Sequence, residues 1–315
     1  MKIVICEFMD EKSVDSLRPR FELVYDPKLV DRPQDLARAL QGAQALVVRN
    51  RTQVDAALLA GAPQLQVVGR LGVGLDNIDV AACQARGVAV IPATGANALA
   101  VAEYVITSAM LLLRGAWLST GAVAAGAWPR TLLSEGRETA GKTLGLVGFG
   151  GIGRLTATLA KALGMRVIAH DPMLDAGAAV WRDSGVAPCS LDELLRTADA
   201  VSLHVPLTAS TRKLMDERRI GMMKPQAVLI NTARGGIVDE AALAHALREG
   251  RLGGAALDVF EHEPLAAGSS LAGAPNLVLT PHIAGVTRES NERVSAMIAE
   301  RVAERLLGAT TTEQS

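Results

Sequence analysis

The chain has 315 residues, of which 49% are hydrophobic and 21% are charged, and its formal net charge is -1. This length exceeds a usual domain of roughly 100–200 residues, so we expect two domains. The apolar content excludes a disordered chain, and the near-zero charge argues against a general surface for nucleic acid or for anionic membranes.

The cysteines are far apart in the sequence and form no CxxC pair: Cys6, Cys83 and Cys189. This spacing predicts neither a disulfide framework nor a thiolate metal site, and no histidine pair has metal-ligand spacing, so we expect no metal. Residues 1–7 lack the long apolar core of a signal peptide, and no apolar run reaches the ~20 residues that cross a bilayer. We therefore expect a cytoplasmic protein with no membrane association.

Short β-rich runs alternate with amphipathic stretches from the start of the chain, which is typical of an α/β fold with parallel sheets. The first strands are predicted at Lys2–Cys6, Ala45–Arg49, Gln66–Gly69 and Val88–Ile91. Helical stretches separate them around Asp35–Leu40, Asp55–Ala60 and Asp79–Arg86. These elements predict a small, flavodoxin-like α/β domain.

A long helix is predicted from Asn97, because apolar residues recur from Leu99 through Ile106 to the run Met110–Leu113. This helix is long enough to link two domains. The stretch Gly121–Gly141 that follows shows no clean periodicity, so we expect a connecting arm there.

A second sheet follows, and its six predicted strands are Leu144–Phe149, Arg166–His170, Ala200–Val205, Ala227–Asn231, Ala255–Phe260 and Leu277–Thr280. Six strands are what a doubly wound parallel sheet of the Rossmann type requires. Ser190 and Glu193 predict a capping box, and Asp239 predicts the cap of a helix that stops at Gly250. The chain finishes with an amphipathic helix near Arg288–Leu306 and the polar tail TTTEQS.

The segment LGLVGFGGIG carries a GxGxxG pattern directly after an apolar strand, with glycines at Gly148, Gly150 and Gly153. Gly148 allows a tight turn, Gly150 lets the backbone approach a pyrophosphate, and Gly153 lets the helix and the strand pack closely. The alternative is a glycine turn that only packs a helix. The strand before the pattern and the helix after it favour a dinucleotide site.

The next predicted strand, RVIAHD, leads into Asp171, near the expected distance of ~20 residues after the glycine pattern. A carboxylate there can accept both ribose hydroxyls and would repel a 2′-phosphate, so the predicted cofactor is NAD rather than NADP. Arg166 and His170 lie close in sequence and would weaken this preference.

Three later segments, NTARGG, LDVFEHEP and TPHIAG, each follow or end a predicted strand. The carboxyl ends of parallel strands meet at one edge, so Arg234, Asp258, Glu263 and His282 are candidates for one ligand crevice. Oxidation of a 2-hydroxy acid needs a base for the hydroxyl proton and a cation for the carboxylate. His282 suits the first role with support from Glu263, and the planar guanidinium of Arg234 suits the second.

The ordered set GxGxxG, HDP, NTARGG, DVFEHEP and TPHIAG resembles the D-isomer-specific 2-hydroxyacid dehydrogenases, which include short forms of phosphoglycerate dehydrogenase. Upstream, VVGRLGVGLDNID and ATGANALAVAEYVI also resemble that family's patterns, so the likeness spans nearly the whole chain. It implies an NAD-dependent oxidoreductase in which His282 is the acid/base, Glu263 its partner and Arg234 the cation that orients the substrate.

The resemblance also implies the coenzyme contacts. Asp258 would contact the nicotinamide carboxamide, while Gly151 and Ile152 would donate backbone N–H groups to the pyrophosphate. The family often has Arg where this chain has Gly151, but a backbone contact should survive that difference. The nicotinamide end would be lined by Thr232, Ala233 and Gly285.

The family fold implies a discontinuous substrate domain of residues 1–96 and 286–315, and a dinucleotide-binding domain of residues 97–285, with the crevice between them. Dimers of the family form through an arm and long helix that correspond to residues 97–141. The resemblance therefore predicts a homodimer.

The segment LGVG would offer the backbone of Val73 and Gly74 to the substrate carboxylate. Arg49 and Arg70 lie at the ends of neighbouring predicted strands around it, and Arg51 is close to the first. A monoanionic acid needs only one cation, so the extra arginines predict a second anionic group, a phosphate or a sulfonate. The alternative for Arg49 and Arg51 is an ordinary solvated strand end.

Within the family, EFMDE, VVRNRTQV, RLGVGLDNID and PATGAN resemble sulfolactate dehydrogenases first and phosphoglycerate dehydrogenases second. The alternative from another class is an NAD-sensing, corepressor-like binding protein on the same fold, and a third is a formate-type or phosphite-type dehydrogenase. His204, in the apolar strand VSLHVP, is predicted to be structural, and no function is predicted for His245 or His262.

Overall fold

A computed structural model describes residues 1–131 and 133–308, so the predicted tail TTTEQS lies outside the described residues. The chain divides into two compact units, one made of Met1–Asn97 and Val286–Ser315 and the other of Ala98–Gly285. At the first crossing this division falls one residue later than the sequence suggests, since Asn97 belongs to the first unit.

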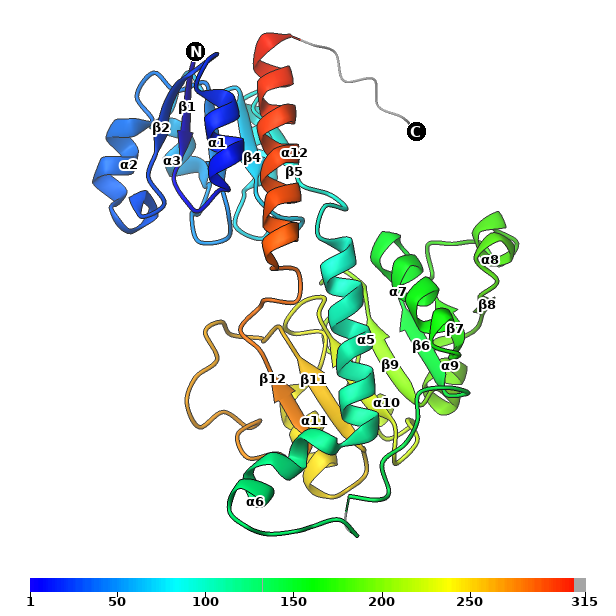
Figure 1. Cartoon of the computed structure of the whole chain (residues 1–315). Coiled ribbons are helices and arrows are strands. Elements are labelled where there is room, and N and C mark those ends of the chain that lie inside the picture. Colours follow the sequence, from blue (N-terminus) through cyan, green and yellow to red (C-terminus); the bar gives the residue numbers. More distant parts are fainter. Residues whose placement is uncertain (132, 309–315) are drawn as a thin grey trace. The chain divides into compact units, whose positions relative to one another are not determined.

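The first unit is built on a five-stranded parallel sheet of order β2-β1-β3-β4-β5 (Figure 1). This is the flavodoxin-like order, in which the first strand lies between the second and the third. The strands are β1 (Lys2–Ile5), β2 (Glu22–Tyr25), β3 (Ala45–Val48), β4 (Val67–Arg70) and β5 (Ala89–Pro92).

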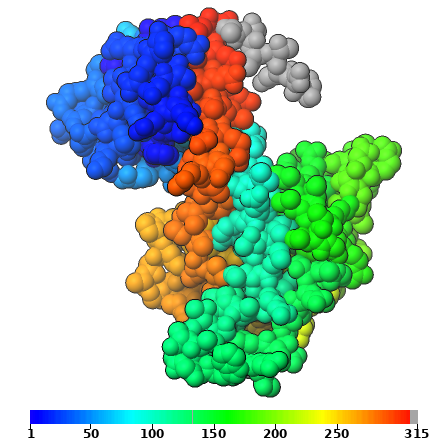
Figure 2. All heavy atoms as spheres, in the orientation of Figure 1, coloured from blue at the N-terminus to red at the C-terminus, as the bar shows by residue number. Residues whose placement is uncertain are grey.

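Helices cover both faces of this sheet, since alternate residues of each central strand point to opposite sides. Ile3 and Ile5 pack against α1 and α12, whereas Val4 packs on the other side against α2, α3 and α4. The elements are α1 (Glu11–Leu17), η1 (Leu29–Asp31), α2 (Pro33–Ala39), α3 (Ala56–Ala60), α4 (Val80–Ala85) and α12 (Arg288–Leu307). Helix α12, drawn in orange to red, lies alongside α1 on the surface of this unit (Figure 2).

The second unit contains a seven-stranded parallel sheet of order β12-β11-β10-β9-β6-β7-β8. Counted from β6, this is the doubly wound order with one further strand. The order in which strands are added to the sheet changes sides between β6 and β9, while all strands stay parallel. The strands are β6 (Thr143–Val147), β7 (Arg166–His170), β8 (Ala187–Pro188), β9 (Ala200–Leu203), β10 (Val228–Asn231), β11 (Gly254–Leu257) and β12 (Leu277–Leu279).

The helices of this unit also form two layers. Helices α5, α7 and α8 pack with Leu144 and Leu146 on one face, and α9, α10 and α11 pack with Val201 and Leu229 on the other. Their bounds are α5 (Ala98–Arg114), η2 (Ala116–Ser119), α6 (Thr120–Ala124), α7 (Gly151–Ala162), α8 (Ala179–Ser184), α9 (Leu191–Thr197), α10 (Glu217–Ile220) and α11 (Glu240–Arg248). The side chain of Asp239 caps α11, as the sequence predicts. The side chain of Ser190 accepts from the N–H of Glu193, which is the first half of the predicted capping box.

Among the described residues no single helix is long and apolar enough to span a bilayer. The pair Ala98–Arg114 and Ala116–Ala124 reaches the necessary length and composition only when taken together, and it is bent by 59°.

Candidate active site

The glycine pattern forms the turn between β6 and α7. Gly148 has a φ of 97°, and a Cβ there would lie 2.5 Å from the carbonyl oxygen of His204. A Cβ on Gly153 would lie 2.5 Å from the carbonyl oxygen of Gly148, so α7 approaches the end of β6 only because Gly153 lacks a side chain. The turn is tight and the helix sits close to the strand, as a dinucleotide-binding loop requires.

Open space lies in front of the first turn of α7. Gly150 is the N-cap residue, and a Cβ there would have no atom of the described chain within 4 Å. Gly151, Ile152 and Gly153 begin this 12-residue helix, where backbone N–H groups have no partner within the helix. A pyrophosphate fits this cradle, because unpaired N–H groups and the helix dipole attract an anion.

Asp171 lies directly against the glycine turn. Its Oδ2 accepts a hydrogen bond of 2.8 Å from the N–H of Phe149, and its Oδ1 accepts one of 2.9 Å from the N–H of Met173. Each carboxylate oxygen keeps a second lone pair for a ligand hydroxyl. Arg166 begins β7 at the opposite end of the strand, and its backbone lies roughly 16 Å from that of Asp171, so it is not placed beside Asp171 as its sequence position suggests.

His204 lies beside the same turn but does not face it as a reactive group. Its Nε2 is 3.0 Å from the hydroxyl of Ser202, and burial lowers the pKa of His204 to about 4. The imidazole is therefore neutral at physiological pH. This hydrogen-bonded, partly buried position agrees with the structural role predicted for it.

His282 and Glu263 form a paired acid and base. Nδ1 of His282 lies 2.8 Å from Oε2 of Glu263, whose Oε1 accepts a 3.1 Å hydrogen bond from the N–H of Phe260. A carboxylate accepts only, so the proton of the neutral imidazole is held on Nδ1 and Nε2 is left to exchange a proton with a ligand. The two side chains are 45% and 36% exposed, so a small molecule can reach them.

Asp258 is buried beneath the segment that carries His282. Its carboxylate accepts hydrogen bonds from the hydroxyl of Thr280 at 2.6 Å, the N–H of Ile283 at 2.8 Å and the N–H of Ala284 at 2.7 Å. Its carbonyl oxygen accepts a further bond of 2.9 Å from the N–H of His282. Its contact with a nicotinamide stays a prediction, because these hydrogen bonds all hold the segment that carries His282 in place.

Arg234 follows β10 in a turn shaped by a buried amide. Asn231 is 1% exposed, and its Nδ2 donates to the carbonyl oxygen of Arg234 at 2.9 Å while its Oδ1 accepts from the N–H of Ala233 at 3.0 Å. Strands β10 and β12 are separated only by β11, so this turn and the His282 segment follow strands about 10 Å apart.

Thr232, in the same turn, has a buried hydroxyl that makes no hydrogen bond within residues 1–131 and 133–308. A buried hydroxyl without a partner is unfavourable unless a ligand or water satisfies it. Gly285 ends the segment after β12 at the same edge of the sheet. These residues fit a site for the nicotinamide end of a coenzyme.

In the first unit, the buried carboxylate of Glu7 fixes the loop that contains Arg49 and Arg51. Glu7 is 3% exposed and accepts hydrogen bonds from the N–H groups of Arg49 (2.9 Å), Arg51 (3.2 Å) and Thr52 (3.1 Å). The guanidinium of Arg49 donates to Oδ1 of Asn291 at 2.7 Å, and burial lowers its pKa. Arg51 instead pairs with Asp31 on the surface, which agrees with the alternative of an ordinary strand-end charge.

The loop that contains Val73 and Gly74 begins where β4 ends at Arg70, whose guanidinium lies over the backbone of Gly72. Val73 is 37% exposed. Asn77 fixes this loop to the preceding one, because its Nδ2 donates to the carbonyl oxygen of Thr52 at 2.7 Å.

Sequence reasoning missed the residues that hold these segments in place. Glu7, Asn77 and Asn231 are buried polar groups whose partners are backbone atoms, and Tyr104 reaches the site from α5. EFMDE, LDNID, NTARGG and AEYVI, which carry them, were all singled out as patterns. A polar residue next to an apolar strand end is the one signal that could have drawn attention to them.

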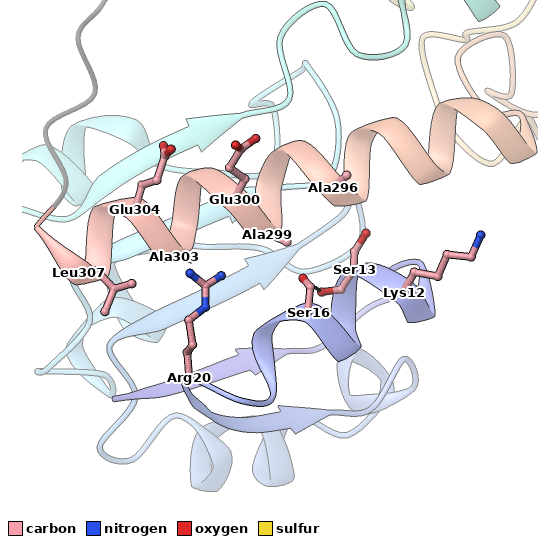
Figure 3. Close-up of a pocket in the computed structure, with 10 residues that line it drawn as sticks. All are labelled: Lys12, Ser13, Ser16, Arg20, Ala296, Ala299, Glu300, Ala303, Glu304 and Leu307. Atoms are coloured by element: carbon pink, nitrogen blue, oxygen red, sulfur yellow. Dashed lines mark hydrogen bonds between the residues drawn. The ribbon is translucent and has the colours of Figure 1, made fainter.

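A surface groove of about 590 Å³ lies between α1 and α12 of the first unit. Figure 3 shows Arg20 reaching from beyond the end of α1 toward α12, where Glu300 and Glu304 line the other side. The floor is made of the small side chains Ala296, Ala299 and Ala303. The groove shares no lining residue with the predicted site.

Residues 106–284 match the sequence model of the D-isomer specific 2-hydroxyacid dehydrogenase, NAD binding domain. Over 300 residues the chain is 56% identical to the (S)-sulfolactate dehydrogenase of Chromohalobacter salexigens, covering 95% of this chain and 96% of that protein. It is 38% identical over 302 residues to the D-3-phosphoglycerate dehydrogenase of Archaeoglobus fulgidus, which covers 96% of this chain but only 56% of that protein.

Among solved structures, the TT0316 protein of Thermus thermophilus is similar along nearly the whole chain. The TM-score is 0.87 at 35% sequence identity, with 99% of each chain covered. The order of elements in both sheets is thus shared with a protein that differs at most positions.

Proposed function

From the premise that the chain belongs to the D-isomer specific 2-hydroxyacid dehydrogenase family, we propose that it oxidises or forms a small 2-hydroxy acid carrying a second anionic group. We place sulfolactate first and 3-phosphoglycerate second as its substrate. The single observation that carries the proposal is the His282–Glu263 pair, because it supplies the acid and base that this reaction needs.

The chemistry assigned to the chain's own residues is a proton transfer at Nε2 of His282. In the oxidising direction Nε2 takes the proton of the substrate hydroxyl, and Glu263 at Nδ1 stabilises the imidazolium that forms. NAD, when bound, accepts the hydride that leaves C2. In the reverse direction the imidazolium returns the proton to the carbonyl oxygen.

The other residues bind and orient. Arg234 holds the substrate carboxylate, since a guanidinium matches a carboxylate with two parallel hydrogen bonds. The coenzyme pyrophosphate is held by the turn from Gly148 to Gly153 and its ribose by Asp171. The nicotinamide end is lined by Thr232, Ala233 and Gly285, with Asp258 beneath them.

The second anionic group of the substrate is bound by Arg49 and Arg70 of the first unit. The backbone N–H groups of Val73 and Gly74 bind the substrate carboxylate, together with Arg234. The 56% identity to a sulfolactate dehydrogenase supports a sulfonate over a phosphate. Residues 1–96 with 286–315 would then be the substrate domain, and residues 97–285 the dinucleotide-binding domain.

We also propose a cytoplasmic homodimer that forms through residues 97–141. Large apolar side chains are exposed along this segment, among them Met110 (42%), Leu118 (45%), Val123 (43%) and Trp128 (79%). These apolar side chains would be available for burial against a second copy of the chain. The alternative of a corepressor-like NAD sensor gains no support from the relatives described above, whose names are those of dehydrogenases.

The proposed function is tested by NAD⁺ reduction with a panel of acids: both enantiomers of sulfolactate, malate, glycerate and lactate, together with 3-phosphoglycerate. We expect the highest kcat/KM for one sulfolactate enantiomer, and at least a 100-fold lower kcat in His282→Ala, because general acid–base catalysis contributes about 10²–10⁴-fold. NADH should still bind this variant. A variant with wild-type turnover would remove His282 from the mechanism, and the exposed His245→Ala is the control.

A further inference from the structure

A chain of hydroxyl groups connects the first turns of α5 to the segment that carries His282. The hydroxyl of Tyr104 lies 2.6 Å from Oγ1 of Thr280, and Oγ1 of Thr280 lies 2.6 Å from Oδ1 of Asp258. Tyr104 and Thr280 are 176 residues apart in the sequence. None of the binding or proton-transfer steps described above uses either residue.

The direction of each bond follows from what each group can donate. The carboxylate of Asp258 only accepts, so Thr280 must donate its hydroxyl proton to Oδ1. Oγ1 of Thr280 is then left to accept, and Tyr104 donates to it. Burial raises the pKa of Tyr104, although its hydrogen bond with Thr280 opposes this, and the charge of Asp258 raises the pKa further. The phenol therefore keeps the proton that it donates.

The carboxylate at the end of this chain fixes the backbone on which the acid/base residue sits. Asp258 accepts from the N–H groups of Ile283 and Ala284, and its carbonyl oxygen accepts from that of His282. His282 itself has a φ of 57°, a left-handed conformation that is uncommon for any residue except glycine. Such a conformation persists only where neighbouring bonds hold it.

The chain of bonds also joins the two places where the polypeptide passes from one unit to the other. Tyr104 lies on α5, which begins at Ala98, the first residue of the second unit. The His282 segment runs directly into Gly285, the last residue of that unit.

We propose that Tyr104 and Thr280 are positioning residues for the dehydrogenase reaction, which hold Asp258 so that the His282 imidazole meets the substrate oxygen. Neither touches the reacting atoms. The inference rests on the proposed function, because it assigns the two residues to the proton transfer at His282. It predicts that loss of the hydroxyl chain lowers kcat while coenzyme binding is unchanged.

The test compares Tyr104→Phe, Thr280→Val and the double variant with the wild-type enzyme in steady-state kinetics. We expect Thr280→Val to lower kcat about 10- to 100-fold, since misplacement by about 1 Å can reduce a rate 10²-fold. The dissociation constant for NADH and the Tm should stay near wild type. Thr280→Ser, which keeps the hydroxyl, should restore most of kcat.

Two further readouts separate positioning from a general loss of stability. If Tyr104 and Thr280 act through the same chain of hydrogen bonds, the kcat of the double variant is no lower than that of Thr280→Val alone. The primary isotope effect on kcat with deuterated hydroxy acid should rise in Thr280→Val, because the chemical step then limits turnover more. Thr143→Val, at the buried start of β6, and Tyr25→Phe, which loses a bond to the Met9 carbonyl oxygen, are matched controls.

The inference is overturned if Thr280→Val has the kcat of Thr143→Val, if Thr280→Ser is as slow as Thr280→Val, or if the loss lies wholly in NADH binding. A wild-type enzyme that reduces NAD⁺ with none of the acids would instead refute the proposed function. The two failures are therefore distinguishable.

Discussion

Arg70 and Arg51 offer a matched test of the second anionic group, since Arg70 ends β4 and Arg51 lies shortly after the neighbouring strand β3. Arg70 lies over the Gly72 backbone in the loop with Val73, whereas Arg51 pairs with Asp31 and is 58% exposed. A charge-assisted hydrogen bond contributes roughly 1.5–3 kcal/mol, so Arg70→Ala should raise the KM for sulfolactate about 10- to 100-fold. Arg51→Ala should leave it within a factor of about two.

The same variants assayed with lactate distinguish the subsite from a general loss of binding. Lactate has no sulfonate, so Arg70→Ala should change its KM little. Equal losses for both acids in Arg70→Ala would show that this arginine does not recognise the second anion. An equal rise in the KM for sulfolactate in Arg70→Ala and Arg51→Ala would also show that Arg70 does not recognise the second anion.

At the scale of single residues, the sequence indicated the groups proposed for the chemistry more readily than the groups that hold them in place. His282 and Glu263 stand in segments of distinctive composition, and the structure brings them to 2.8 Å. Tyr104 and Thr280 are ordinary members of a helix and a strand end, and nothing local encodes a bond across 176 residues. Asp258 illustrates the same limit: the family resemblance implies a nicotinamide contact, which stays a prediction, but gave no sign of its hydrogen bonds with Thr280, Ile283 and Ala284.

At the scale of elements, we expect substitutions of two glycines in the turn between β6 and α7 to have different effects on the Tm. Gly153→Ala places a Cβ 2.5 Å from the Gly148 carbonyl oxygen, which must push α7 away from β6. Overpacking of this kind destabilises by about 1–3 kcal/mol, so the Tm should fall roughly 2–10 °C and NADH affinity should fall with it.

Gly150→Ser is the contrasting variant, because its Cβ enters open space and its hydroxyl can cap the helix. The Tm should be unchanged or slightly raised, while NADH affinity falls at least about tenfold since the pyrophosphate cradle is filled. Differential scanning fluorimetry and NADH titration measure the two quantities. Equal affinity for NADH in wild type and Gly150→Ser would place the pyrophosphate elsewhere.

The elements themselves were largely predictable, and those that were missed share a physical reason. The predicted bounds of the apolar strands at the centre of each sheet lie within three residues of the observed ones, because burial on both faces produces continuous apolar runs. Strand β2 (Glu22–Tyr25) is an edge strand with little buried surface, and β8 (Ala187–Pro188) has only two residues. Neither leaves a pattern long enough to be recognised.

At the scale of the whole molecule, the two crossings of the chain were close to the positions expected from the family likeness. Composition and strand pattern alone indicated two sheets but not that the last helix, α12, returns to the first. Its buried side chains Val294, Ile298 and Val302 pack with β1, β3 and β4, and an amphipathic pattern does not say which sheet it will cover.

All three tryptophans, Trp117, Trp128 and Trp181, belong to the second unit, so tryptophan fluorescence reports the unfolding of that unit alone. This unit also contains His204, whose pKa burial lowers to about 4. A histidine that is neutral when folded takes up a proton only on unfolding once the pH falls below the unfolded pKa of about 6.5. Its contribution to stability is therefore fully present above pH 6.5 and is lost progressively between pH 6.5 and 4.

Urea unfolding followed by tryptophan fluorescence at pH 7, 5.5 and 4.5 should show this loss, which amounts to at most about 3 kcal/mol for one histidine. His204→Gln, which keeps a partner for Ser202, should flatten the decline, whereas the exposed His245→Gln should not. Burial opposes the lowering of the pKa of Asp199, but its hydrogen bonds from the Thr143 N–H and from Lys224 outweigh it. The contribution of Asp199 to stability is therefore lost only as the pH falls below about 3.8, and it is the same in all variants. If the free energy of unfolding falls equally with pH in wild type and His204→Gln, His204 must be protonated in the folded enzyme as well. A positive charge would then lie beside the glycine turn.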